Sequence, residues 1–118
     1  MPVIEIAALP PAGEIDVTAA LGHVAGEVAD FLGEDPRGTW AIWRPIGPGH
    51  YAEGHDAPAS QPKTTHPAVV HVLANRTPDQ VGPLLEVVGA AVVRALGLEE
   101  GNVVVRFEAA DPERMFWG

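Results

Sequence analysis

Two stretches of the chain have apolar residues every three or four positions, the spacing of one face of an α-helix. The first predicted helix begins after Asp16, which is suited to N-capping, and ends at Gly33. The second begins with the capping-box sequence Thr77-Pro78-Asp79-Gln80 and ends at Gly97. Each pattern predicts an amphipathic helix. The apolar faces consist of Val17, Leu21, Val24, Val28 and Leu32, and of Val81, Leu85, Val88, Val92 and Leu96.

Short apolar runs precede and follow each helix and predict β-strands. Val3–Leu9 and Ala68–Leu73 precede the helices, and Gly38–Arg44 and Asn102–Phe107 follow them. A strand, a crossover helix and a second strand form a parallel pair. Two such units predict an α/β fold, a four-stranded, mostly parallel sheet with both helices on one face. The other face would be bare, and another subunit is its simplest cover in so short a chain.

The two units align with each other without a gap. The alignment pairs Leu9 with Leu73 and Gly33 with Gly97 along the chain. We therefore expect one domain, residues 1–118, built from a first repeat at 1–54 and a second at 65–118. The polar, proline-containing segment 55–64 is expected to connect them.

Composition narrows the possible partners. The chain has 118 residues, 16 acidic against 7 basic side chains and a formal charge of −9. Without a basic cluster, nucleic acid and anionic membranes are not expected as partners. The absence of cysteine excludes disulfides and thiolate chemistry, and the N-terminus lacks a signal-peptide pattern. These features predict a cytoplasmic protein, and no apolar run approaches the ~20 residues of a membrane span.

Three motifs resemble the tautomerase superfamily. They are the Met-Pro start with Pro2, the turn Gly49-His50-Tyr51-Ala52-Glu53-Gly54, and the strand-to-helix junction Val70–Thr77, which contains Arg76. The resemblance covers nearly the whole chain, with the first repeat fitting without gaps from Pro2 to Gly54. The chain is similar to a doubled form of 4-oxalocrotonate tautomerase, and this resemblance implies a homotrimer whose sheets pack around a central barrel.

The resemblance implies an enzyme, a tautomerase or related isomerase, with Pro2 as the catalytic residue. In the family the initiator methionine is removed, and the proline nitrogen acts as general base or acid on a small enol or keto carboxylate. A free α-amino group has a pKa near ~8, and a secondary amine held in a rigid ring is a pre-positioned base. While Met1 remains attached, the Pro2 nitrogen is a non-basic amide.

The substrate carboxylate needs a planar, bidentate donor, and the resemblance assigns this role to Arg76. The family's second-strand arginine aligns with Trp40 in the first repeat and Val104 in the second. Arg106, two residues beyond Val104 on the same strand face, is the expected substitute. These arginines are the predicted substrate-binding residues, together with Tyr51.

The remaining candidates could line the pocket or simply pack, namely Trp40, His50 and Phe116. A metal site could be drawn from His50, His55 and Asp56. The two histidines lie in a loop with no helix to align them, and no third strong ligand is apparent. Neither a metal nor another cofactor is therefore expected.

Three alternatives to an isomerase stay open. The first is a hydratase or dehalogenase relative that acts on an unsaturated carboxylic acid, and the second is a non-catalytic binding or assembly protein on the same fold. The third, a ferredoxin-like ligand-sensing module, predicts antiparallel pairing and an unburied residue 2.

Overall fold

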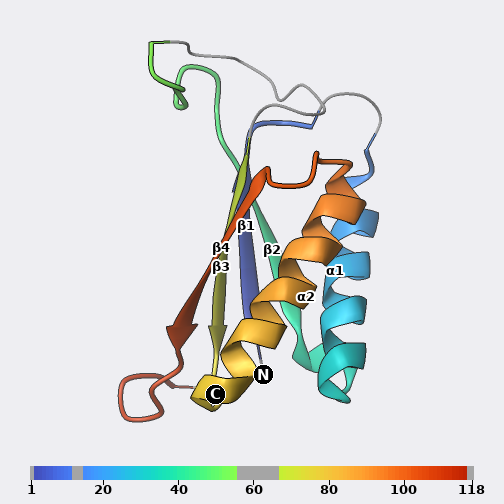
Figure 1. The fold of residues 1–118 in the computed structure, drawn as a ribbon, viewed down its shortest axis with the longest axis vertical. Helices are drawn as coiled ribbons and strands as arrows, with labels where there is room; N and C mark the ends of the chain where they lie inside the picture. The colour runs from blue at the N-terminus through green and yellow to red at the C-terminus, as the bar shows by residue number, and fades with distance from the viewer. Residues whose placement is uncertain (1, 12–14, 56–66, 117–118) are drawn as a thin grey trace.

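The computed structural model describes residues 2–11, 15–55 and 67–116. Four strands form one layer, and two helices lie on one side of it (Figure 1). This arrangement confirms the α/β architecture predicted from the apolar pattern. The elements in chain order are β1 (Val3–Ala8), α1 (Val17–Leu32), the 3-10 helix η1 (Pro36–Gly38), β2 (Trp40–Pro45), β3 (Ala68–Ala74), α2 (Pro78–Leu96) and β4 (Val103–Ala109).

The strands lie in the order β2-β1-β3-β4. β1 is parallel to β2 and β3 is parallel to β4, as expected for two strand-helix-strand units. The central pair, β1 with β3, is antiparallel. The sheet is therefore mostly parallel, as predicted, but its two units run in opposite directions. As a result, β1 and β2 begin at the end of the sheet where β3 and β4 finish.

Both helices begin and end where the sequence predicts. The Asp16 side chain accepts a hydrogen bond from the Ala19 backbone N at 3.1 Å, and the Thr77 backbone N donates to Gln80 Oε1 at 3.0 Å. Both helices end at a glycine in the left-handed region, Gly33 at φ 67° and Gly97 at φ 65°. None of the helices in the described part of the chain is long and apolar enough to cross a membrane.

The predicted second strand of the first unit begins too early. The structure starts β2 at Trp40 rather than at Gly38, because a 3-10 turn occupies the preceding residues. Asp35 caps this turn by accepting from the Arg37 backbone N at 2.9 Å. Of the predicted connector 55–64, all but His55 lies outside the described residues.

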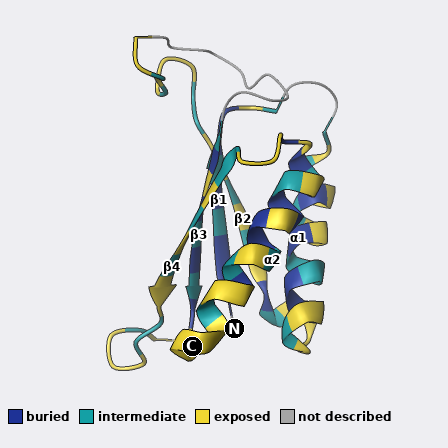
Figure 2. Cartoon of the chain, viewed as in Figure 1, coloured by how far each residue is buried: buried dark blue, intermediate teal, exposed yellow. Residues whose placement is uncertain are grey.

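The core fills the space between the sheet and the helices (Figure 2). Alternate residues of the central strands point toward the helices and are fully buried, and the apolar helix faces meet them. The residues with essentially no exposed surface include Ile4, Ile6, Val70 and Val72 from the strands, and Val24, Val28, Leu84, Val88 and Val92 from the helices.

None of the described residues forms a layer over the opposite face of the sheet, and we call this face the open face. Several large apolar side chains are exposed on it, and charged side chains lie between them. Arg44 donates to both carboxylate oxygens of Glu5, from Nε at 3.1 Å and from Nη2 at 3.0 Å. The open face consists of Val3, Glu5, Ala7, Trp40, Ile42, Arg44, Val69, His71, Leu73, Val104, Arg106 and Glu108.

Candidate functional site

Pro2 lies at the end of the sheet where β1 begins. Its side chain is fully buried, and its carbonyl oxygen accepts a hydrogen bond from the Trp40 backbone N at 3.0 Å. The parallel register pairs Val3 with Trp40, so Pro2 lies beside Thr39. Thr39 is only 5% exposed, and its Oγ1 has no hydrogen-bond partner among the described residues. The proline and a buried hydroxyl-bearing residue are thus neighbours on the face that packs against the helices.

Arg76 comes to the same end of the sheet from β3. The antiparallel register pairs Val3 with Leu73, so the end of β3 lies beside the start of β1. Only 15% of the Arg76 side chain is exposed. Its Nη2 donates to Glu34 Oε2 at 3.0 Å and its Nη1 to the Asn75 carbonyl at 2.9 Å. Its Nε is buried and has no partner in the described part of the chain.

The ion pair between Arg76 and Glu34 joins two chain segments next to a groove. Glu34 follows the end of α1, and its side chain is 40% exposed, whereas Arg76 precedes the start of α2. A cavity of about 300 Å³ lies between these two helix ends, lined by Phe31, Leu32, Asp79, Gln80 and Pro83. Neither Pro2 nor Arg76 is among its lining residues, so this cavity lies beside the ion pair and does not contain it.

Two predicted site residues lie on the open face instead. Trp40 is the first residue of β2 and is 48% exposed. Arg106 is exposed in the middle of β4, in register with His71, which is in turn in register with Glu5. Two strand-to-strand steps separate Arg106 from β1, so a single chain does not bring it to Pro2.

Tyr51 and His50 lie at the end of the sheet opposite to Pro2. The segment that contains them follows β2, and its first residue, Ile46, donates to the carbonyl of Ala8 at the far end of β1 (Figure 1, green). Tyr51 Oη donates to Glu53 Oε1 at 2.8 Å. Burial, together with this hydrogen bond and the Glu53 charge, raises the pKa of Tyr51 to about 12. The phenol is therefore a donor throughout the neutral range.

Phe116 follows β4 and is 93% exposed. β4 ends beside β3 at the Pro2 end of the sheet. Of the predicted site residues, the structure thus brings Pro2 and Arg76 to one end, with Trp40 and Phe116 near it, and leaves Tyr51, His50 and Arg106 elsewhere in the chain.

Glu34 and Thr39 are not among the site residues predicted from the sequence. Glu34 directly follows the glycine that ends α1, and no spacing pattern connects it with Arg76. Thr39 gives a weak signal, since it is a polar residue directly before an apolar strand and on the buried face. The strand pairing places Thr39 at the Pro2 end, and the ion pair with Arg76 places Glu34 there.

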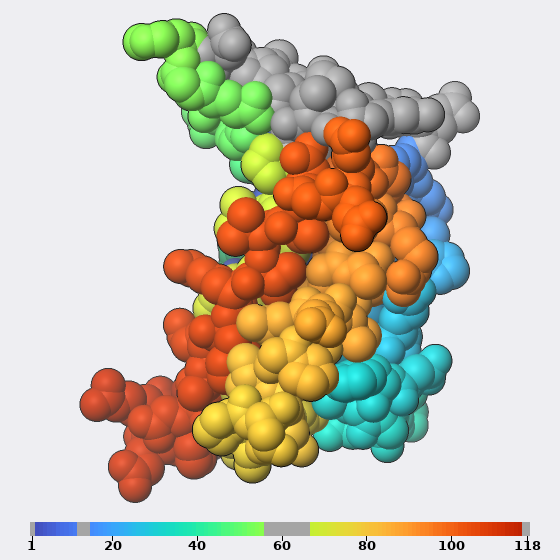
Figure 3. All heavy atoms as spheres, in the orientation of Figure 1, coloured from blue at the N-terminus to red at the C-terminus, as the bar shows by residue number. Residues whose placement is uncertain are grey.

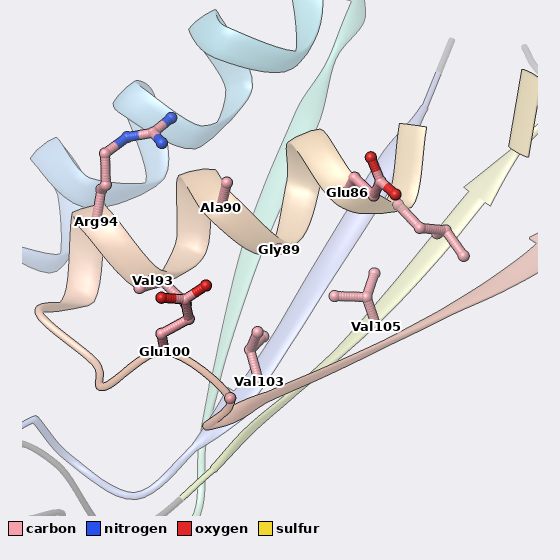
Figure 4. Close-up of a pocket in the computed structure, with 10 residues that line it drawn as sticks. Glu86, Gly89, Ala90, Val93, Arg94, Glu100, Val103 and Val105 are labelled. Atoms are coloured by element: carbon pink, nitrogen blue, oxygen red, sulfur yellow. The ribbon is translucent and has the colours of Figure 1, made fainter. Parts of the chain in front are cut away.

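A second groove, of about 570 Å³, lies between α2 and β4, which are side by side in the space-filling view (Figures 3 and 4). In Figure 4, Gly89 of α2 faces Val103 and Val105 of β4. A Cβ on Gly89 would lie 3.4 Å from Val105 Cγ2, so the glycine allows close packing here. None of the predicted site residues lines this groove. Within the described ranges, no group of three or more His, Asp or Glu side chains could hold a metal ion.

Comparison with known proteins shows the fold. No family model and no curated protein matches the sequence. Native fused 4-OT matches with a TM-score of 0.78 and 17% identity, over 98% of this chain and 92% of that one. A fused 4-OT described as an asymmetric trimer matches with a TM-score of 0.78 and 13% identity, over 98% of this chain and 92% of that chain. A member of the cis-3-chloroacrylic acid dehalogenase family matches with a TM-score of 0.67 and 22% identity, over 98% of this chain and 79% of that chain. The chain therefore has the fold of tautomerase superfamily structures over nearly its whole length, as the sequence resemblance implies.

Proposed function

We propose that this protein is a tautomerase-type isomerase in which Pro2, freed by removal of Met1, moves a proton on a small enol or keto carboxylate. The observation that carries the proposal is the meeting of Pro2 and Arg76 at one end of the sheet. One residue supplies a candidate base and the other a candidate carboxylate-binding group. Both belong to a chain with the fold of fused 4-OT.

The chemistry of Pro2 requires a free secondary amine. A free α-amino group titrates near ~8, and burial or a nearby arginine charge lowers the pKa of this group because each disfavours the cation. The amine accepts the enol hydroxyl proton as the carbonyl forms, and the resulting ammonium gives a proton to the carbon of the former double bond. The substrate is isomerised from enol to keto form, and the amine is regenerated.

Arg76 is proposed to bind the substrate carboxylate. A guanidinium offers a planar fork that matches a carboxylate, and Arg76 directly precedes Thr77, the N-cap of α2. The free N–H groups of that helix start also favour an anion.

We further propose a homotrimer in which the open faces of three subunits pack together. Exposed apolar side chains on that face support this arrangement, and a fused 4-OT of the same fold is described as a trimer. The proposed roles of Tyr51, His50 and Arg106 then require these residues of one subunit to reach the Pro2 end of a neighbouring subunit. The pocket is complete only in the assembly.

The test combines intact mass with turnover. The purified protein should lack the mass of Met1, and it should convert the enol forms of phenylpyruvate or 2-hydroxymuconate to their keto forms, followed by ultraviolet absorbance. Pro2→Ala should lose this activity, whereas Pro10→Ala, at an exposed proline beyond β1, should keep it. Quantitative retention of Met1, or equal turnover by Pro2→Ala, would contradict the proposal.

Two observations favour a non-catalytic binding or assembly protein as the second candidate. Arg76 is already engaged by Glu34, and Trp40 and Val104 occupy the positions where the resemblance expects a strand arginine. This candidate predicts a trimer that retains Met1 and turns over no enol substrate.

A hydratase or dehalogenase relative is the third candidate, and the similarity to the dehalogenase-family structure supports it. In that case a protonated Pro2 would act as an acid during addition of water to an unsaturated acid. Pro2-dependent release of chloride from 3-chloroacrylate would identify it.

A further inference from the structure

The hydrogen bonds of Arg76 are incomplete along one edge of its guanidinium. The Nε and Nη2 atoms form that edge and together match the two oxygens of a carboxylate. Arg44 fills both positions with Glu5, and Arg37 fills both with Asp35 at 3.3 and 2.9 Å. In Arg76 only Nη2 has a carboxylate partner, Glu34, and Nε has none among the described residues.

Burial makes this difference important. The side chains of Arg37 and Arg44 are 91% and 61% exposed, so water reaches them freely, whereas the Arg76 side chain is 15% exposed. A buried donor without an acceptor is unfavourable. A carboxylate that accepts from both Nε and Nη2 of Arg76 would make a hydrogen bond that Glu34 does not make.

We propose that Glu34 is an internal competitor that substrate displaces. In the free protein Glu34 holds Nη2 of Arg76. An incoming carboxylate takes Nε and Nη2 together, and the Glu34 side chain moves into water. Glu34 is suited to this because its side chain is 40% exposed and it lies in the short segment between α1 and η1. The inference rests on the proposed function in one respect, that Arg76 binds the substrate carboxylate.

The displaced Glu34 also affects which carboxylates bind. It keeps its negative charge near the site, and two other arginines at this end, Arg37 and Arg114, are each paired with an aspartate of the chain. A second carboxylate on the substrate would meet the Glu34 charge. Removal of the Glu34 charge should therefore favour a dicarboxylate more than a monocarboxylate.

The test measures binding of two non-enolisable acids of the same carbon frame, crotonate and fumarate, by titration calorimetry. The protein is the full chain in the Pro2→Ala background, which separates binding from turnover. Glu34→Gln should bind crotonate roughly three- to tenfold more tightly than the parent, with a larger gain for fumarate. Asp35→Asn is the matched control, because it removes the adjacent carboxylate, which pairs with Arg37, and should change affinity less than about twofold.

A second readout follows the arginine directly. In protein with ¹⁵N-labelled arginine, crotonate should shift the Nε–H resonance of Arg76 and slow its exchange with water, because Nε gains an acceptor. The signal is assigned by its loss in Arg76→Lys. A lysine presents a point charge without the planar fork, so this variant should also bind crotonate more weakly.

Equal gains in crotonate affinity in Glu34→Gln and Asp35→Asn would overturn the inference, since a general loss of negative charge would then explain both gains. Weaker binding by Glu34→Gln would also overturn it, because Glu34 would then serve to orient Arg76. Pro2-dependent turnover without crotonate binding in any variant would reject the role of Arg76 and leave that of Pro2. The expected binding without Pro2-dependent turnover would support the inference and count against the proposed catalysis.

Discussion

The ion pair between Glu5 and Arg44 on the open face gives a direct test of the proposed trimer. In one chain the Glu5 side chain is 31% exposed and the Arg44 side chain 61% exposed. A partly exposed pair of this kind contributes about 1 kcal/mol or less. If three open faces pack together, the pair becomes buried, and removal of one partner leaves an uncompensated charge, at a cost of about 3–5 kcal/mol. Glu5→Gln should therefore weaken assembly more than it weakens the fold.

The same pair predicts an acid-sensitive contribution to the stability of the fold. The hydrogen bond from Arg44 lowers the pKa of Glu5 below its usual 4.5, against an opposing effect of burial. Because the folded-state pKa is the lower one, the stabilisation is fully present above pH 4.5 and is lost as the pH falls through the folded-state value. The folded chain should therefore lose this contribution to its stability on acidification below 4.5, and Glu5→Gln should lack it at every pH.

Analytical ultracentrifugation over a dilution series at neutral pH measures the effect on assembly, and thermal unfolding at neutral pH and near pH 4 measures the effect on the fold. Glu27→Gln is the control, because Glu27 pairs with Arg94 between the two helices, away from the open face. Thermal unfolding of each variant separates loss of fold from loss of assembly. A Glu5→Gln trimer that dissociates at the same concentration as the wild type, or equal weakening by Glu27→Gln, would refute the assignment of this face to the interface.

Three further predictions concern individual side chains. Gly26→Ala should raise the free energy of unfolding by about 0.5–1 kcal/mol, since its Cβ would meet no atom within 4 Å. Gly33→Ala should lower the free energy of unfolding, because φ 67° is a left-handed conformation that favours glycine. Thermal unfolding measures both. Leu84→Ala should cost about 2–5 kcal/mol in urea unfolding, because the fully buried leucine would leave a cavity. Tyr51 is the single tyrosine, so absorbance near 295 nm should show phenolate only near pH 12, and Glu53→Gln should lower that midpoint.

Local features of the sequence predicted the helices well and one strand less well. Asp16 and the capping box at Thr77 act within one turn of the chain, so their effect depends on neighbouring residues alone. The start of β2 was placed too early because Asp35 and Pro36 begin a 3-10 turn that the apolar pattern does not reveal. Glu34 could not be found from the sequence, since its partner Arg76 lies in the other unit and is reached only through the folded chain.

The candidate site depends on the one pairing that the apolar pattern does not determine. The pattern predicted parallel strands within each unit, but it is compatible with either direction between the units. A strand rises roughly 3.3 Å for each residue, and β3 has seven residues. If β3 ran parallel to β1, its end would therefore lie about 20 Å away from Pro2. The antiparallel pair instead places the junction with Arg76 beside the first residue of β1. Pro2 comes from the first unit and Arg76 from the second, so the direction in which the units join creates the site.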